Sequence, residues 1–518
     1  MQEEWKMRRF FLIVLVSLLV VTGCAVNPVT GKNELSLVPE SWELGVGKKQ
    51  YAPMRQAQGG DYVVDPSVQA YVAEVGQRLA AVSDRKLPYE FKVLNDSTPN
   101  AWALPGGKIV VNRGLLTELK SESELAAVLG HEIVHAAARH GAKGMQRGML
   151  LQGALLATTI ALHGKEYANL AQLAGGIGAK LISQKFSREA ESEADHYGMV
   201  YMSRAGYDPQ GAVELQRTFV KLFEKRKPSW LSGLFASHPP SRERLGANIR
   251  EAAELPKGGE VGQARYLKRM AHVLKTKDAY VAYDKAKAAL KKGDMAAARG
   301  LLDKAIAIEP REAHFYALKG DIERKRGHRR LAKRYYDKAV KLNSGFFYYY
   351  LQRGMLEGRM GARAAARADL LQSAKLLPTA DAYNALGNIA RIEGDVSTAK
   401  RFYAQAAESK SQAGKSAYAS LVKLDLPENP GKYIKVRTGI SQQGQLIAEL
   451  SNPTPYGVGD IVIAVRYPTS AGQLRDATKA VYGYLPSGRQ MRVPLGSGFP
   501  PEAGGRVQGM VIRARILK

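Results

Sequence analysis

The segment His131-Glu132-Ile133-Val134-His135 has the residue types and spacing that point most directly to chemistry. On an α-helix, residues four apart lie on one face, so His131 and His135 can present ring nitrogens to the same point. A helix binds Zn²⁺ in this way, with the glutamate of the motif beside the open coordination position. Zinc activates water, and a neighbouring carboxylate can take the proton of that water as it attacks a carbonyl. The motif therefore predicts zinc-dependent hydrolysis with Glu132 as the general base.

A catalytic zinc has three protein ligands and one water, so a third ligand must come from elsewhere in the chain. The extended motif with a further histidine six residues after the second ligand is absent, and a glutamate on a second helix is the other common solution. Residues 187–198 form an acid-rich, helix-forming segment in which Glu191 and Asp195 are four apart and share a face. Glu191 is therefore a candidate ligand, and Asp195 can accept a hydrogen bond from a ligand histidine. Glu189 and Glu193 are expected on a solvated face.

Four ordered segments carry a resemblance to a known family. They are HEIVHAAARH at the zinc motif, SREAESEAD from Ser187, SHPPSRER from Ser237, and NAWALPGGKIVV from Asn100. Together they resemble the peptidase family of HtpX and the CaaX prenyl endopeptidases, most closely its periplasmic, TPR-bearing branch of β-barrel-assembly-enhancing proteases. The resemblance covers roughly residues 25–410. It implies a mainly α-helical metalloprotease domain of the gluzincin type over residues 24–264.

The resemblance also implies roles for individual residues. One zinc ion is bound by His131, His135 and Glu191, while Glu132 acts as general base and Asp195 supports the site.

Two further residues are candidates beside the metal. The resemblance implies that His238 lies near the zinc, where it can cap the ion and hold the enzyme latent. The oxyanion of the reaction needs a stabiliser besides the metal, and either His238 or Arg244 can supply it. His140 is expected to be structural, because a continued helix places it off the ligand face.

The first residues predict export and a lipid anchor. A basic start is followed by a largely apolar stretch at residues 10–21, which is shorter than the roughly 20 residues of a membrane-spanning helix but suits a signal peptide. The stretch ends in Val21-Thr22-Gly23-Cys24, which looks like a bacterial lipobox, and Cys24 is the only cysteine in the chain. Residues 1–23 are thus predicted to be a lipoprotein signal peptide. Because Ala25 follows rather than aspartate, we expect the periplasmic face of the outer membrane.

A repeat follows the protease segment. Gly293, Gly327, Gly361 and Gly394 recur at spacings of 34, 34 and 33, and each is followed five residues later by alanine. This period, with glycine at the turn and a small residue where helices cross, predicts a helical TPR solenoid over residues 265–431. TPR grooves bind peptides and proteins, so unfolded or misassembled envelope proteins and the outer-membrane assembly machinery are the expected partners. Tyr348, Tyr349 and Tyr350 are candidate groove residues, although helix packing is the expected role of at least one.

The chain is strongly basic. Its formal charge is +28, and residues 265–345 hold 22 Lys+Arg against 9 Asp+Glu, a net of +13. In an exported lipoprotein such a surface suits lipid headgroups, lipopolysaccharide phosphates or acidic protein segments rather than nucleic acid. A solvated helical surface explains the charge equally well.

Two segments carry strand patterns. Residues 432–518 change to a period of two, with Leu446, Ala448 and Leu450 alternating with their neighbours, which predicts a small β-sandwich-like domain of open function. Residues 108–112, Lys-Ile-Val-Val-Asn, read as a strand just before the zinc helix. The resemblance implies that it is an edge strand that pairs with substrate backbone, and the alternative is an ordinary buried strand.

The predicted function is that of a lipid-anchored periplasmic zinc metalloendopeptidase for misfolded or stalled outer-membrane proteins. The alternative from another class is a chaperone or assembly scaffold with a latent protease. A scaffold should tolerate Glu132→Gln, whereas an obligate protease should not.

Overall fold

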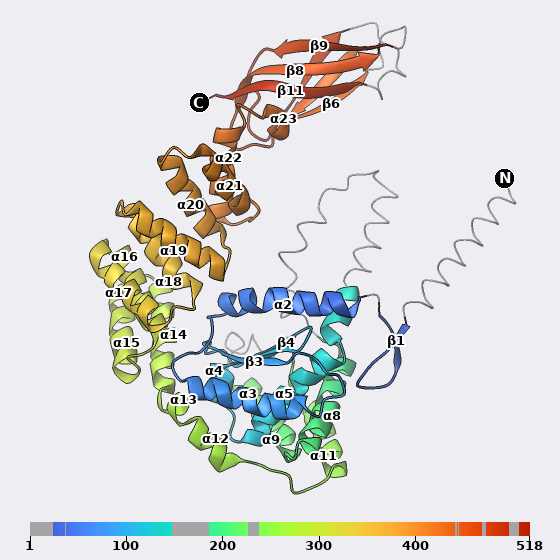
Figure 1. The fold of residues 1–518 in the computed structure, drawn as a ribbon, viewed down its shortest axis with the longest axis vertical. Coiled ribbons are helices and arrows are strands. Elements are labelled where there is room, and N and C mark those ends of the chain that lie inside the picture. Colours follow the sequence, from blue (N-terminus) through green and yellow to red (C-terminus); the bar gives the residue numbers. More distant parts are fainter. Residues whose placement is uncertain are drawn as a thin grey trace, which may run out of the picture. The chain divides into compact units, whose positions relative to one another are not determined.

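The computed structural model describes residues 24–36, 38–147, 186–225, 238–440, 443, 445–468, 473–496 and 507–517 (Figure 1). The predicted signal peptide lies outside these residues. The chain divides into two compact units, residues 1–346 and 347–518. The predicted domain boundaries after residues 264 and 431 stay predictions. Within the described part, no helix is both long and apolar enough to cross a bilayer.

A small mixed sheet forms the centre of the first unit. It contains β3 (Glu90–Leu94), β4 (Ala101–Leu104) and β5 (Lys108–Asn112) in the order β3-β5-β4, with β3 parallel and β4 antiparallel to β5. Every residue of β5 is buried. The prediction of an edge strand at residues 108–112 is wrong, because β5 pairs with β3 on one side and with β4 on the other. The two edge strands are β3 and β4.

Helices cover both faces of this sheet (Figure 1). On one face, α2 (Glu40–Ala57) packs through Tyr51 against Trp102 and Val110. On the other, α3 (Pro66–Ala80) and α5 (Glu122–Ala137) share a large apolar core with the remaining strand side chains. The core thus holds α5, the helix of the zinc motif, directly against the sheet.

A second helix crosses α5 at very close range. In α8 (Arg188–Arg204), a Cβ atom added at Gly198 would lie 3.1 Å from the backbone nitrogen of His131. A Cβ atom at Gly130 of α5 would lie 3.0 Å from the carbonyl oxygen of Gly198. The two glycines therefore let the helix backbones approach closely enough for side chains of α8 to reach the zinc motif.

The remaining elements of the first unit surround this pair or lead into the repeats. They are β1 (Cys24–Val26), β2 (Asn33–Leu35), α4 (Arg113–Leu116), α9 (Gln210–Lys225), α11 (Arg242–Glu254), α12 (Gln263–Arg269), α13 (Ala271–Lys275), α14 (Lys277–Lys291), α15 (Met295–Ile308), α16 (Ala313–Lys325) and α17 (Arg329–Leu342). Strands β1 and β2 form an antiparallel hairpin.

The helical repeat is confirmed in both units. The second unit begins with α18 (Phe347–Arg359), α19 (Arg363–Leu376), α20 (Ala380–Ile392), α21 (Val396–Ala407) and α22 (Gln412–Asp425). The four repeat glycines adopt the left-handed conformation, with φ between 83° and 86°, which ends the first helix of each pair. The alanines five residues later, at 298, 332, 366 and 399, are fully buried at the helix crossings. Tyr349 is also fully buried.

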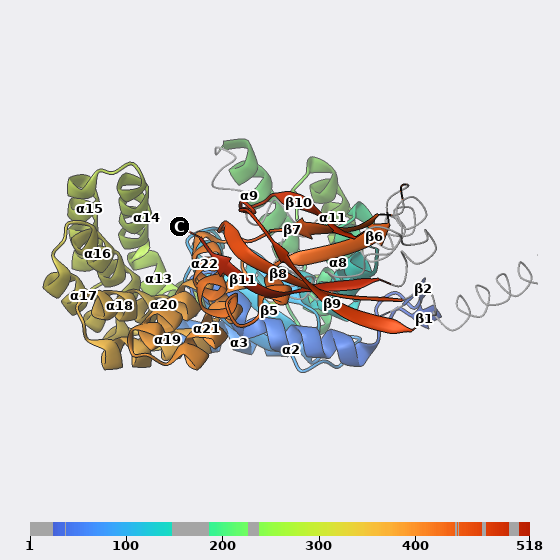
Figure 2. The same ribbon diagram turned by 90° about the horizontal axis from the view of Figure 1, so that it is seen from above.

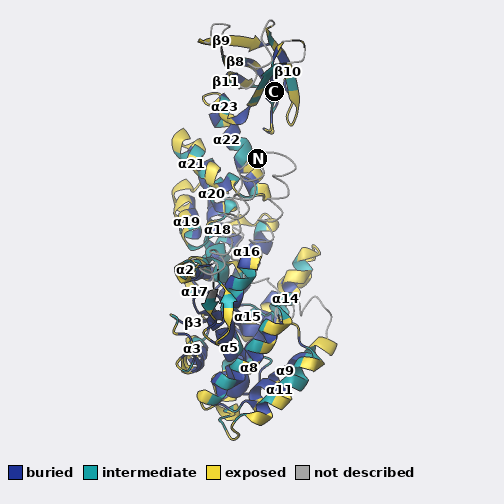
Figure 3. Ribbon diagram, turned by 90° about the vertical axis from the view of Figure 1, so that its right-hand side faces the viewer, coloured by how far each residue is buried: buried dark blue, intermediate teal, exposed yellow. Residues whose placement is uncertain are grey.

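The C-terminal strands form two small antiparallel sheets, which confirms the predicted all-β class (Figure 2). After α23 (Pro430–Tyr433), one sheet contains β6 (Lys435–Ile440), β7 (Leu446–Ser451) and β10 (Gln490–Gly496). The other contains β8 (Val458–Pro468), β9 (Leu474–Val481) and β11 (Gln508–Ile516). Side chains from both sheets share one core, including the alternating residues of β7. Strand β9 is exposed over nearly all of its length (Figure 3).

The last strand departs from simple alternation. The register between β11 and β8 shifts between Val511 and Arg513. Val511 and Ala514 consequently point into the core, while Ile512 is 43% exposed. A bulge adds one residue on one strand and so reverses the faces that follow it.

Candidate metal centre

Helix α5 positions the three residues of the zinc motif. The helix begins after Ser121, whose hydroxyl accepts a hydrogen bond from the backbone N–H of Glu124 at 3.1 Å. This N-cap fixes the helix start. One turn separates His131 from His135, and both rings point to the same side.

Two other segments complete the cluster. Helix α8, capped by Ser187, carries Glu191 in its first turn. His238 lies just before α11, which is capped by Ser241. The side chains of His131, His135, Glu191 and His238 can each offer one ligand atom, and these atoms lie within 4.8 Å of one another.

The separations between these atoms fit a tetrahedral metal site. His131 Nε2 lies 3.0 Å from His135 Nε2 and 3.2 Å from His238 Nδ1. Glu191 Oε1 lies 2.8 Å from His238 Nδ1 and 3.4 Å from His135 Nε2. Ligands at about 2.0–2.1 Å from zinc would be about 3.3 Å apart in a regular tetrahedron. Three ring nitrogens this close cannot all hydrogen-bond to one another, whereas a cation satisfies all three lone pairs.

The electrostatics of the ligands agree with this fit. Burial lowers the pKa of His135 well below its ordinary value, which keeps a lone pair free. Burial opposes ionisation of Glu191, but the nearby rings of His238 and His135 lower the pKa of its carboxyl overall. Glu191 Oε2 is buried without a well-formed hydrogen bond, although it lies 2.8 Å from Arg244 Nη1 as an ion pair. This ion pair holds Oε2, so Oε1, which faces His135 and His238, is the oxygen that can bind a metal.

Glu132 lies beside the cluster but outside it. Burial raises the pKa of Glu132 above its ordinary value. Its Oε1 lies 3.7 Å from His238 Nε2. A carboxyl group with a raised pKa next to a metal site can both take and return a proton.

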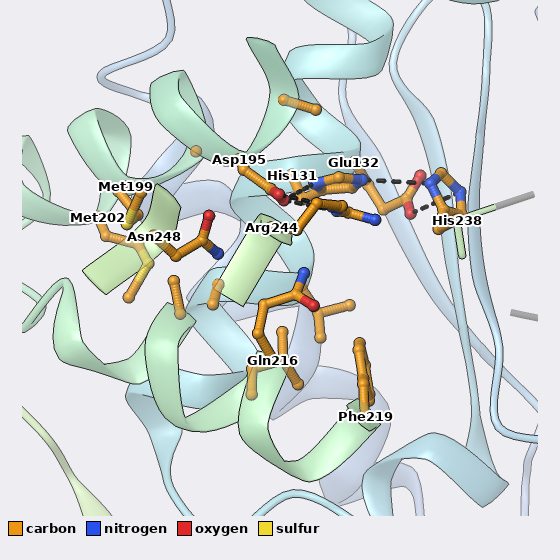
Figure 4. A pocket seen from close by; sticks show the side chains of 16 residues that line it. His131, Glu132, Asp195, Met199, Met202, Gln216, Phe219, His238, Arg244 and Asn248 are labelled. Atoms are coloured by element: carbon orange, nitrogen blue, oxygen red, sulfur yellow. Dashed lines mark hydrogen bonds and ion pairs between the residues drawn. The ribbon is translucent and has the colours of Figure 1, made fainter. Parts of the chain in front are cut away.

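Asp195 and Arg244 hold the ligands from outside (Figure 4). Asp195 Oδ1 lies 3.0 Å from His131 Nδ1, the ring nitrogen that faces away from the other donors. Arg244 donates two hydrogen bonds to the Asp195 carboxylate, at 2.8 and 2.7 Å. Asp195 thus contacts His131, and Arg244 contacts both Asp195 and Glu191.

His140 and Glu193 have a closer relation to the cluster than the sequence indicates. His140 Nδ1 lies 2.8 Å from His135 Nδ1, and His140 Nε2 lies 3.2 Å from Glu193 Oε1. The expected solvated face is therefore wrong for Glu193, whose side chain is only 20% exposed, while Glu189 is exposed. The cause is the end of α5 at Ala137, after which Arg139 adopts a left-handed conformation with φ of 61°. This turn redirects His140 toward His135.

Phe186 is a further site residue that sequence reasoning missed. Its ring stacks on the His135 ring, with centroids 4.1 Å apart and planes 26° apart. No spacing rule relates this residue to the zinc motif, because the contact forms only when Phe186, just before α8, meets His135 of α5 in the folded chain. Its packing restricts rotation of the ligand ring.

A small cavity lies beside the donor cluster, and His131, Glu132 and His238 are among the residues that line it (Figure 4). It measures about 40 Å³. Most of its wall is apolar, from Val128, Met199, Met202, Leu215 and Phe219. One water needs about 10–15 Å³ by this kind of measure, so the cavity has room for about three or four non-hydrogen atoms.

Comparisons with known proteins give one family and one repeat. The sequence profile of peptidase family M48 matches residues 66–252, and a tetratricopeptide repeat profile matches residues 313–346 and 380–412. Peptidases of family M48 use zinc, and the donors found here suit one such ion.

Three curated relatives illustrate the likeness. The beta-barrel assembly-enhancing protease of Escherichia coli K12 is 32% identical over 210 residues, which are 39% of this chain and 42% of that protein. The mitochondrial metalloendopeptidase OMA1 of Schizosaccharomyces pombe is 38% identical over 179 residues, 34% of this chain and 50% of that protein. The metalloprotease YcaL of Escherichia coli K12 is 32% identical over 178 residues, 33% of this chain and 68% of that protein. The chain thus spans half or less of the length of the first two.

Proposed function

Because the chain belongs to peptidase family M48, we propose that it is a zinc metalloendopeptidase. The observation that carries this proposal is the convergence of His131, His135, Glu191 and His238 on one point beside the buried carboxyl of Glu132. Zinc at this point would polarise the scissile carbonyl and activate water.

The roles of the protein's own groups follow from their positions. Glu132 takes the proton of the attacking water and passes it to the leaving amine, which its raised pKa favours. Asp195 accepts the Nδ1 proton of His131 and so leaves Nε2 free for the metal. Arg244 is the nearest fixed cation to the cluster among the described residues and can bind a developing oxyanion once His238 withdraws.

His238 supports a latent resting state. Its Nδ1 occupies the fourth corner of the donor set, at 3.2 Å from His131 Nε2 and 2.8 Å from Glu191 Oε1. That corner is where a catalytic zinc site keeps its water. We therefore infer that His238 caps the metal and must leave before hydrolysis.

The outer edge of β4 supports the binding of an extended substrate. Asn112 N donates to Asn100 O, so by register the N–H and C=O groups of Ala103 point away from β5. No other strand of the described residues pairs with this edge of β4. A peptide added here would run as a further strand near α5. The cavity beside Glu132 then favours a side chain the size of valine or leucine next to the scissile bond.

The cellular setting remains part of the proposal. Lipidation at Cys24 would tether the protein to the periplasmic face of the outer membrane. The repeat helices would recruit misfolded or stalled envelope proteins or the assembly machinery. Cys24→Ala should release the protein from membranes, and globomycin should block its processing. Membrane attachment that survives Cys24→Ala would contradict the anchor.

Casein cleavage and zinc content test the enzyme directly. Purified wild-type protein should bind one zinc, and Glu132→Gln should keep the metal while losing cleavage by about 10²–10⁴-fold, the usual contribution of a general base. His238→Ala should keep zinc and cleave faster than wild type, because the cap is gone. A fully active Glu132→Gln variant would refute the base assignment. Unchanged activity in His238→Ala would argue against the cap, and zinc without cleavage in any variant would favour the scaffold.

A further inference from the structure

A chain of polar contacts leads from a metal-site histidine to the N-terminal hairpin. His135 turns Nε2 toward the donor cluster and Nδ1 toward His140 Nδ1, 2.8 Å away. His140 Nε2 lies 3.2 Å from Glu193 Oε1. The same oxygen of Glu193 accepts a hydrogen bond from Asn27 Nδ2 at 3.3 Å. None of these three outer residues takes part in the proposed hydrolysis.

Only one placement of hydrogens satisfies the whole chain. If His135 Nε2 binds a metal, the ring hydrogen must sit on Nδ1, from which it donates to His140. His140 then accepts at Nδ1 and must carry its own hydrogen on Nε2, which donates to Glu193. The Glu193 carboxylate can only accept, and it accepts from both His140 and Asn27. The outer groups therefore select the tautomer of His135 that binds metal.

The hairpin holds Asn27 firmly in this position. Asn27 is 3% exposed, and its Oδ1 accepts a hydrogen bond from Val29 N at 2.9 Å. Its backbone nitrogen donates to Lys32 O at 2.8 Å across the hairpin. Its Nδ2 also donates to Glu34 Oε1 at 3.2 Å, and Glu34 pairs with Lys143 at 2.5 Å. The amide that faces Glu193 is thus fixed by contacts on both sides.

We propose that the hairpin of β1 and β2 is part of the metal centre. Asn27 and Glu193 are positioning residues that act through His140 to fix the tautomer and ring orientation of His135. Asn27 lies three residues after Cys24, so the segment next to the predicted lipid anchor contributes to metal binding. The inference rests on the proposed zinc site and extends it to the N-terminus. Loss of such outer partners typically weakens metal binding about 10–100-fold.

Zinc affinity of the full chain, measured by competition with a chelator, tests the proposal. Glu193→Ala and His140→Phe should each raise the zinc Kd by about 10–100-fold. Asn27→Ala should raise the zinc Kd by a smaller factor. In the Glu193→Ala variant, Asn27→Ala should cause no further rise in Kd, because Asn27 acts on His140 through Glu193. Matched controls are Glu189→Ala on the exposed face of α8 and Asn33→Ala on the exposed part of the hairpin, and both should bind zinc as wild type does. With cobalt in place of zinc, the visible absorption bands should change in the first set and not in the controls.

The outcomes separate this inference from the proposed function. If wild type binds no zinc, the metal site itself is wrong. If wild type binds zinc and His131→Ala loses it, but Glu193→Ala and His140→Phe bind as tightly as the controls, the inference is overturned. If those two variants unfold, Asn27→Asp decides, because it keeps the shape of the side chain while it presents an acceptor to Glu193. A raised zinc Kd in Asn27→Asp supports the coupling, and an unchanged Kd overturns it.

Discussion

Gly198→Ala tests whether the close crossing of α5 and α8 sets the metal geometry. An added Cβ atom would lie 3.1 Å from His131 N, 3.3 Å from Gly130 C and 3.4 Å from His131 Cα. All three atoms belong to helix backbone, so α8 must move away from α5 by a few tenths of an ångström. Overpacking of this kind costs about 1–3 kcal/mol, while alanine in place of glycine within a helix returns about 0.5–1 kcal/mol. The net loss of unfolding free energy should therefore be at most about 2.5 kcal/mol.

The same substitution should also weaken zinc binding, because it moves a ligand on α8 away from the ligands on α5. Glu191 lies on α8, two turns before Gly198, and its Oε1 must stay 3.4 Å from His135 Nε2 on α5. Metal sites tolerate errors of only about 0.2 Å in ligand distance, so the same displacement should weaken zinc binding by at least about tenfold.

For Gly198→Ala, thermal unfolding measures the loss of unfolding free energy, and competition with a chelator measures the loss of zinc affinity. The matched control is Gly300→Ala in α15, where an added Cβ atom meets nothing within 4 Å. The control should raise the free energy of unfolding by about 0.5–1 kcal/mol and leave zinc affinity unchanged. If Gly198→Ala binds zinc as tightly as this control, the helix crossing does not limit the site and the reasoning fails.

Two further predictions concern the substrate edge and the C-terminal unit. Ala103→Pro removes an N–H group that points away from β5, so it should abolish peptide cleavage while zinc binding survives. Ala103→Val, which keeps the N–H group, is the control. Normal cleavage by the proline variant would rule out pairing of the substrate with β4. Burial opposes ionisation of Asp425, but hydrogen bonds from Tyr433 and Lys432 lower the pKa of its carboxyl overall. Its stabilising contribution should be complete above about pH 4 and be lost as pH falls further, and Asp425→Asn should lose about 1–3 kcal/mol at neutral pH together with that acid sensitivity. Thermal unfolding between about pH 3 and 7 measures this, and identical pH profiles for variant and wild type would contradict it.

The sequence predicts the features of this molecule that depend on residues close together in the chain. Residues four apart share a helix face, so His131 and His135 meet, and the same rule places Asp195 beside Glu191. The repeat glycines end helices in the left-handed conformation that glycine adopts without strain. These features depend on the chain within one turn or one repeat.

The rest depends on contacts between distant segments. The position of β5 at the centre of its sheet depends on which strands pair with it, and the sequence of one strand does not state its neighbours. The contact of His140 with His135 depends on where α5 stops, and the left-handed turn at Arg139 has no glycine to indicate it. Asn27 lies more than a hundred residues from the zinc motif, and only the folded hairpin brings it to Glu193.

Anomalous diffraction at the zinc edge, from crystals of the zinc-loaded protein, would show whether His131, His135, Glu191 and His238 bind one zinc ion. One peak is expected, at about 2.0–2.2 Å from His131 Nε2, His135 Nε2, Glu191 Oε1 and His238 Nδ1. A peak elsewhere, or one with His238 turned away and water in its place, would contradict a metal centre capped at rest.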